Sequence, residues 1–137
     1  MTKWPELPKD VQAVVLSWPS AAQSHFYALR DILWGVAAAN PAIGPLSEAL
    51  RWGEPSFLTK QSGSGTALRI SWSAKHPDDI GIYVICRTDM LEQVRSLYPD
   101  SFRYVGTRGA MLSLNSDIPE DAVAFCGQRA FTYHLSR

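Results

Sequence analysis

The sequence has few cysteines, no excess charge of either sign and no long apolar run. Its two cysteines, Cys86 and Cys126, are too far apart in sequence to form a close metal-ligand pair, so we interpret both as core thiols in a reducing cytosol. Thirteen basic and thirteen acidic residues balance, which argues against a broad surface for nucleic acid or an anionic membrane but leaves room for a local patch. No apolar run of signal-peptide type opens the chain, and none is long enough to span a bilayer. We therefore predict a soluble, cytoplasmic protein without a nucleic-acid or membrane partner.

Catalytic signatures are also missing. The loop at 62–65, Ser-Gly-Ser-Gly, lacks the glycine spacing of a nucleophile elbow and has no following lysine of the kind found in phosphate loops. The histidines His25, His76 and His134 are scattered, so only folding could assemble a triad around one of them. We predict a binding protein rather than an enzyme, and keep as an alternative a small enzyme that uses Glu54 or a histidine.

Hydrophobic periodicity and helix-terminal residues predict four helices. Apolar residues recur at helical spacing over 8–18 and again over 20–39, where Ser20 and Gln23 have the spacing of a capping box. A third helix is expected over 89–98 with Thr88 as its cap. The last helix begins with Pro-Glu-Asp at 119–121, residues favoured in a first turn, and is expected to end near residue 135.

The remaining apolar segments predict strands. They lie at 50–59, 67–74, 80–86, 102–105 and 110–114. The nearly continuous apolar run at 80–86 indicates a central strand that is covered on both faces. Because most connections are hairpins, we predict an α+β fold in one domain over 1–137, with a mainly antiparallel sheet packed against N-terminal and C-terminal helices.

The segment at 52–57, Trp-Gly-Glu-Pro-Ser-Phe, is the most unusual feature that is present. Gly53 permits backbone angles closed to other residues, and Pro55 favours an extended conformation for the residue before it. In one interpretation the aromatic residues of the segment are core and Gly53 marks a bulge. In a second the segment docks a protein partner. In a third it forms a small-ligand pocket, whose predicted lining is Trp52, Glu54, Phe57, Trp72, Tyr83 and Arg108.

Two further groups of polar residues are candidate sites. Arg103, Tyr104, Arg108 and Gly109 surround a turn and could bind an anion, although a solvated hairpin is the simpler interpretation and the one we favour. The metal candidates are His76, Asp78 and Asp79, with Asp117, Glu120 and Asp121 as additions, of which the start of the last helix already explains Glu120 and Asp121.

The chain resembles a known family, the YdhG-like proteins, also called domain of unknown function 1801. The resemblance rests on the box at 52–57 after a long helix, the strand at 80–83, and a late strand at 109–114 that leads through Ile-Pro at 118–119 into a terminal helix. It covers roughly 20–135 and implies a frataxin-like fold. For one branch of the family it also implies an intracellular iron carrier. The resemblance assigns no iron ligand to any position of this chain, so iron is an alternative to the prediction that no cofactor is bound.

Overall fold

The computed structural model of the protein describes residues 4–84 and 89–135. Two helices are followed by four strands, a helix, two strands and a final helix. The helices are α1 (Lys9–Leu16), α2 (Ser20–Ala39), α3 (Met90–Leu97) and α4 (Glu120–Phe131), and the strands are β1 (Ser47–Arg51), β2 (Glu54–Leu58), β3 (Leu68–Ser71), β4 (Asp79–Tyr83), β5 (Arg103–Val105) and β6 (Gly109–Ser113). The predictions for Cys86 as a core thiol and Thr88 as a helix cap concern residues outside these ranges.

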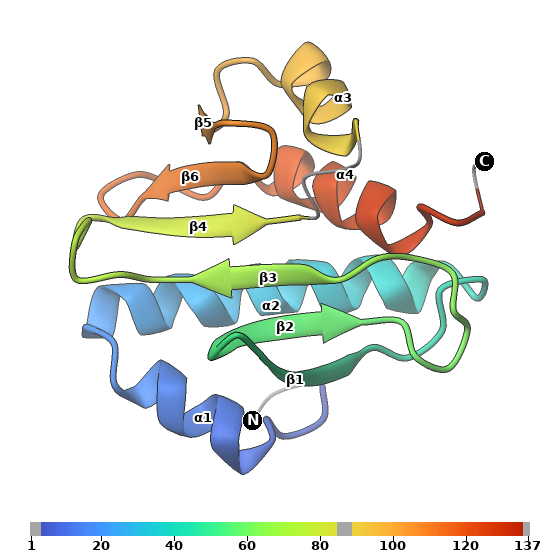
Figure 1. Ribbon diagram of the computed structural model, residues 1–137, viewed down its shortest axis with the longest axis horizontal. Helices are drawn as coiled ribbons and strands as arrows, with labels where there is room; N and C mark the ends of the chain where they lie inside the picture. Colours follow the sequence, from blue (N-terminus) through green and yellow to red (C-terminus); the bar gives the residue numbers. More distant parts are fainter. Residues whose placement is uncertain (1–3, 85–88, 136–137) are drawn as a thin grey trace.

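The strands of the described residues form one sheet in the order β1-β2-β3-β4-β6-β5 (Figure 1). Every neighbouring pair is antiparallel. After β4 the chain passes through α3 and β5 before β6 returns beside β4. The predicted α+β class, with an antiparallel sheet and packed N-terminal and C-terminal helices, is confirmed. Within residues 4–84 and 89–135 no helix is long and apolar enough to cross a membrane.

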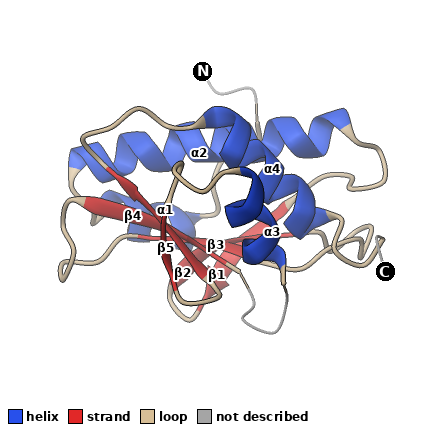
Figure 2. Ribbon diagram, turned by 90° about the horizontal axis from the view of Figure 1, so that it is seen from above, coloured by secondary structure: helices blue, strands red, loops and turns tan. Residues whose placement is uncertain are grey.

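The helices α2 and α4 cover one face of the sheet and leave the other face open (Figure 2). Figure 1 looks onto the open face, with α2 behind the strands. Successive residues of a strand point to opposite faces, so the fully buried Ile80 and Ile82 of β4 face the helices, while Tyr83 lies on the open face. The central position predicted for this strand is confirmed. The prediction that it is covered on both faces is wrong, because the helices of the described residues all pack on the other face from Tyr83 or at the edges of the sheet.

Helix α2 has the predicted bounds but not the predicted N-terminal cap. Its N-cap residue is Pro19, Ser20 is already helical, and no side chain caps the first turn. Gln23 instead donates a hydrogen bond back to the Trp18 carbonyl at 2.8 Å. The capping-box prediction is therefore wrong, and this side chain ties α2 to the segment before it. The apolar stripe of the helix is buried as its spacing predicts, at Phe26, Leu29 and Leu33.

The loop of glycine and serine after β2 closes the end of α4. The Ser64 hydroxyl donates to the Phe131 carbonyl at 2.6 Å, and the Thr66 amide donates to the Ala130 carbonyl at 2.9 Å. Gly65 lies so close to the backbone of Ala130 and Phe131 that a Cβ atom there would overlap it. These bonds satisfy carbonyls that a helix end leaves open. They also explain why α4 ends at Phe131, before the predicted end near residue 135.

A buried ion pair fastens the edge strand β1 to α2. Arg30 is 2% exposed, and it binds the Glu48 carboxylate through Nε to Oε2 at 2.8 Å and Nη2 to Oε1 at 2.7 Å. Arg30 also donates to the Pro5 carbonyl, and the Trp34 indole donates to Glu48 at 3.2 Å. Because the two charges are buried together and hydrogen-bonded, removal of either one leaves the other uncompensated in the interior.

Replacing Glu48 should therefore destabilise the protein strongly. We expect Glu48→Ala to lower the free energy of unfolding by about 3 to 5 kcal/mol, the usual loss when one partner of a buried pair is removed. The control is Arg103→Ala, which breaks the exposed Arg103–Asp79 pair at 2.7 Å and should lower it by less than about 1 kcal/mol. Urea unfolding measures both losses, and similar losses for the two variants would contradict the buried role of Glu48.

The thiol of Cys126 should make the fold sensitive to alkali. Cys126 is fully buried, as predicted, and burial raises its pKa from 9.0 to about 12. The unfolded chain loses the thiol proton near the ordinary pKa, while the folded chain keeps it. The contribution of this thiol to stability is therefore fully present below pH 9.0 and is lost as the pH rises toward 12.

We expect the stability advantage of wild type over Cys126→Ala to shrink between pH 7 and pH 10.5, by at most about 1.4 kcal/mol per pH unit above the pKa of the free thiol. Urea midpoints at the two pH values measure this difference. A constant difference would show that the thiol titrates alike in both states.

Candidate functional site

A tight turn at Trp52 and Gly53 joins β1 to β2. Arg51 pairs with Glu54, so only two residues form the loop. Both have positive φ, 52° at Trp52 and 75° at Gly53, as the favoured two-residue hairpin turns with a right-handed twist require. The prediction of one continuous strand over 50–59 is therefore wrong. Gly53 serves a turn here and not a bulge.

Trp52 is strained and exposed at the same time. A bulky residue with positive φ is an outlier, because its Cβ approaches the following carbonyl at a cost of about 1–2 kcal/mol. Among the described residues Trp52 is also the only one besides glycine in this conformation. Its side chain is 87% exposed, so burial in the core does not offset the strain. Backbone strain of this kind occurs most often at functional sites.

Arg69 of β3 holds the indole in place. Its guanidinium carbon lies 5.1 Å from the centre of the Trp52 ring and 5.7 Å from the centre of the Tyr83 ring, within the range of cation–π attraction. The same guanidinium binds the Glu54 carboxylate at 2.5 Å. Three neighbouring strands thus contribute to one cluster: Glu54 from β2, Arg69 from β3 and Tyr83 from β4. The strands are in register because Ser56 of β2 pairs with Arg69, and Arg69 pairs with Tyr83.

Tyr83 forms the base of this cluster. Its ring covers Gly81 and Gly109, where a Cβ atom would approach the ring to 2.6 Å and 3.1 Å. Its hydroxyl lies 3.5 Å from the sulfur of Met111. Burial raises the pKa of Tyr83, with a further increase from the nearby Glu54 carboxylate, so this phenol stays neutral at physiological pH.

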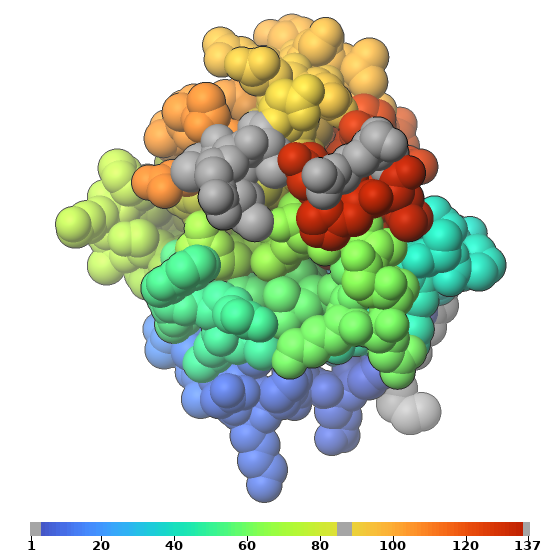
Figure 3. All heavy atoms as spheres, turned by 45° about the vertical axis from the view of Figure 1, so that its right-hand side comes forward, coloured from blue at the N-terminus to red at the C-terminus, as the bar shows by residue number. Residues whose placement is uncertain are grey.

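A cavity of about 640 Å³ opens beside the cluster, within the size range of small-ligand sites. Figure 3 shows this side of the molecule, where the green residues of β1, β2 and β3 lie below the orange residues of β5 and β6. The walls combine apolar side chains with basic ones. They are Leu50, Arg51, Trp52, Leu58, Ala67, Arg69, Val84 and Arg108.

The charges around the cavity are mostly positive. Arg69 is neutralised by Glu54. Within residues 4–84 and 89–135, neither Arg51 nor Arg108 has a carboxylate within ion-pair distance, and no carboxylate lines the cavity. A concave surface with charges of one sign concentrates the field and favours ligands of the opposite sign.

The predicted pocket residues are only partly brought together. Trp52 and Arg108 lie on the cavity wall, and Glu54 and Tyr83 contact Arg69 beside it. Phe57 points to the opposite face, where it is buried against Phe26 of α2 with ring centroids 6.2 Å apart. Trp72 lies at the β3–β4 turn, where its indole donates to the Pro77 carbonyl at 3.0 Å. The structure does not place these last two residues at the cavity.

Sequence reasoning missed Arg51 and Arg69. The alternation in β3 predicts correctly that Arg69 points away from the core. Its place beside Trp52 depends on the register of β2 and β3, which no local pattern specifies. Arg51 could have been found from its position next to the box at 52–57.

The predicted cluster around the β5–β6 turn separates into three environments. Arg103 pairs with Asp79 on the open face, whereas Arg108 lines the cavity. The Tyr104 hydroxyl donates to the Tyr98 carbonyl at 2.8 Å on the helix side. Burial, and next the neighbouring Cys126, raises the pKa of Tyr104 to about 12.

The candidate metal ligands are not assembled into a metal site. Asp79 is bound to Arg103, and in the parts of the chain that the structure describes no three His, Cys, Asp or Glu residues are grouped to hold a metal ion. His25 bonds to the carbonyls of Ala21 and Ser116, at 3.2 Å and 3.3 Å. Among the residues that the structure describes, no histidine lines the cavity beside Trp52.

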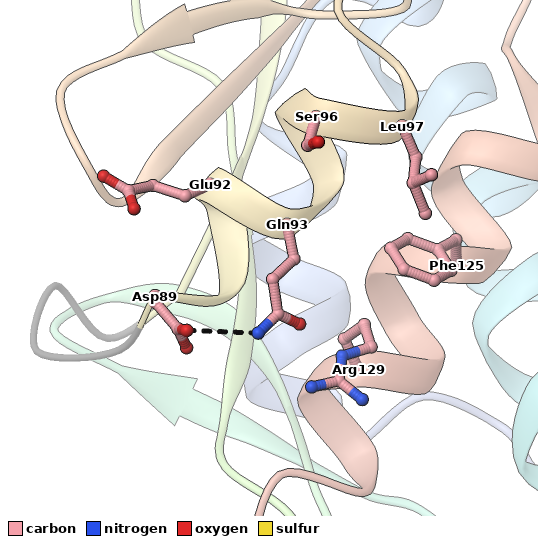
Figure 4. A pocket seen from close by; sticks show the side chains of 7 residues that line it. All are labelled: Asp89, Glu92, Gln93, Ser96, Leu97, Phe125 and Arg129. Atoms are coloured by element: carbon pink, nitrogen blue, oxygen red, sulfur yellow. Dashed lines mark hydrogen bonds between the residues drawn. The ribbon is translucent and has the colours of Figure 1, made fainter.

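A second, shallower pocket of about 520 Å³ lies between α3 and α4 (Figure 4). Asp89 and Gln93 on its α3 side are hydrogen-bonded to each other at 3.1 Å, and Arg129 extends from α4. The Nε atom of Arg129 is buried, and no atom of the described residues accepts a hydrogen bond from it. Glu92 adds a second carboxylate, so this pocket has mixed charge and less capacity to select an anion than the cavity beside Trp52.

The structure thus defines an α+β protein with one open sheet face and a basic, partly apolar cavity on that face. A comparison of the chain with models of protein families, with curated proteins and with solved structures finds no match. What the cavity binds is therefore inferred from the residues around it.

The strain at Trp52 predicts a gain in stability when the turn receives a residue suited to positive φ. Asparagine tolerates this conformation and alanine does not, while both remove the indole and its contact with Arg69. We expect Trp52→Asn to be more stable than Trp52→Ala by about 1 kcal/mol in urea unfolding. Equal stability of the two variants would show that the turn stores no strain.

Proposed function

We propose that this chain is a binding protein whose cavity beside Trp52 holds a small organic anion. The observation that carries the proposal is the pair of arginines without carboxylate partners in the described ranges, Arg51 and Arg108, on the wall of a single cavity. A guanidinium presents its donors in a planar fork that matches a carboxylate or phosphate.

The apolar part of the wall sets the second property of the ligand. Leu58, Ala67 and Val84 offer hydrocarbon surface, and Trp52 offers an exposed ring. A bare inorganic anion would leave this surface in contact with water. An anion with an attached apolar or aromatic group would bury it, at about 25 cal/mol for each Å² removed from water.

The arrangement supports binding more than catalysis. Glu54 was the predicted carboxylate of an enzyme, but its oxygen is bound to Arg69 at 2.5 Å, so it is engaged as a structural acceptor. The described part of the cavity wall holds no histidine that could act as a base toward a bound molecule. The membership of the YdhG-like family, its frataxin-like fold and the iron carrier role all stay predictions that no observation on the described residues favours.

Thermal unfolding with small anions tests the proposal. We expect biphenyl-4-carboxylate to raise the unfolding temperature in a concentration-dependent way, because a ligand that binds only the folded state stabilises it. The neutral amide of the same skeleton should have little effect. In Arg108→Gln the affinity for the carboxylate should fall about tenfold, the usual loss for a hydrogen bond to a charged group.

Arg103→Gln is the matched control. It removes an arginine from the same hairpin and the same face of the sheet, but Arg103 does not line this cavity. Its affinity should equal that of wild type. Stabilisation that is absent, or that Arg108→Gln and Arg103→Gln reduce equally, would contradict the proposed site.

A further inference from the structure

The two arginines without carboxylate partners in the described ranges enter the cavity from opposite sides. Arg51 ends β1, an edge strand of the sheet, and Arg108 directly precedes β6. Between these strands lie β2, β3 and β4, so at about 4.8 Å per strand the backbones of β1 and β6 are roughly 19 Å apart. Both guanidinium groups would need to extend fully toward each other to hold one small anion.

The middle of the cavity is neutral. Arg69 lies on β3, between the two other arginines in the order of strands, and its charge is compensated by Glu54 at 2.5 Å. Leu58 of β2 and Ala67, directly before β3, add apolar surface to the same central region. The wall thus changes from basic to neutral and apolar, and back to basic, across the strands.

We infer that the ligand is an elongated dianion, with an acidic group at each end and an apolar, flat middle. This inference rests on the proposed function and specifies the ligand class of the same site. One acidic group binds Arg51 and the other binds Arg108, while the middle lies against Leu58, Ala67 and the Trp52 ring. A monoanion would leave one of the two arginines without a partner.

The test compares biphenyl-4,4′-dicarboxylate with biphenyl-4-carboxylate, which differ only in the second acidic group. Calorimetric titration of the full chain should show the dicarboxylate binding at least tenfold more tightly to wild type. In Arg51→Gln and in Arg108→Gln the two probes should bind with about equal affinity, because only one acidic group of the dicarboxylate can then bind an arginine. The double variant should bind neither probe measurably.

Trp52→Leu separates the role of the ring from that of the charges. The ring contacts the shared middle of both probes, so this variant should weaken both by the same factor and leave the preference for the dicarboxylate unchanged. Unfolding temperatures without ligand verify that the variants are folded, which the exposure of Arg51, Trp52 and Arg108 favours.

The outcomes distinguish the two proposals. If both probes bind through Arg108 with equal affinity in wild type, the elongated dianion is wrong and the anion-binding function stands. The dianion is also wrong if the preference for the dicarboxylate persists in both single variants. If neither probe binds to wild type, the proposed function fails together with the inference.

Discussion

In the described part of the chain, the helices α2 and α4 cover one face of the antiparallel sheet and leave the other open, and most of the structure depends on this constraint. Burying Phe57, Leu68, Ile70 and Ile82 against α2 and α4 supplies the main apolar contact of the fold. Because side chains alternate along a strand, the same burial fixes which residues must face away from the helices. The buried Arg30–Glu48 pair would otherwise conflict with this apolar layer, and it is tolerated because each charge compensates the other.

The open face of the sheet carries a cluster of charged and aromatic side chains. Arg69, Glu54 and Tyr83 come from three neighbouring strands and are brought together by the register alone. The cluster restrains the Trp52 ring, whose backbone conformation is unfavourable for any residue with a large side chain. A strained residue persists when its surroundings fix it from several directions, and here two paired strands and a guanidinium do so.

Much of the fold could be predicted from the sequence. The bounds of α2, the central position of β4 and the α+β class follow from periodicity, because burial of one helix stripe or one strand face leaves a regular pattern. The segment at 50–59 was predicted less well. Its apolar content suits a strand throughout, and tryptophan in place of the usual asparagine or glycine conceals the turn. The end of α4 was missed because it depends on a loop residue, Ser64, that lies 67 positions earlier in the chain than Phe131.

The sequence by itself determined the four helices, most of the strands and the buried stripe of α2, and that the box at 52–57 is locally unusual. These properties depend on neighbours within a few positions. Only the tertiary structure decided that Phe57 leaves the site, that Arg69 joins it, and that Arg51 and Arg108 share a cavity. The physical reason is strand register: a shift of one residue would move every side chain to the other face, and burial across the whole sheet, not any local preference, selects the register.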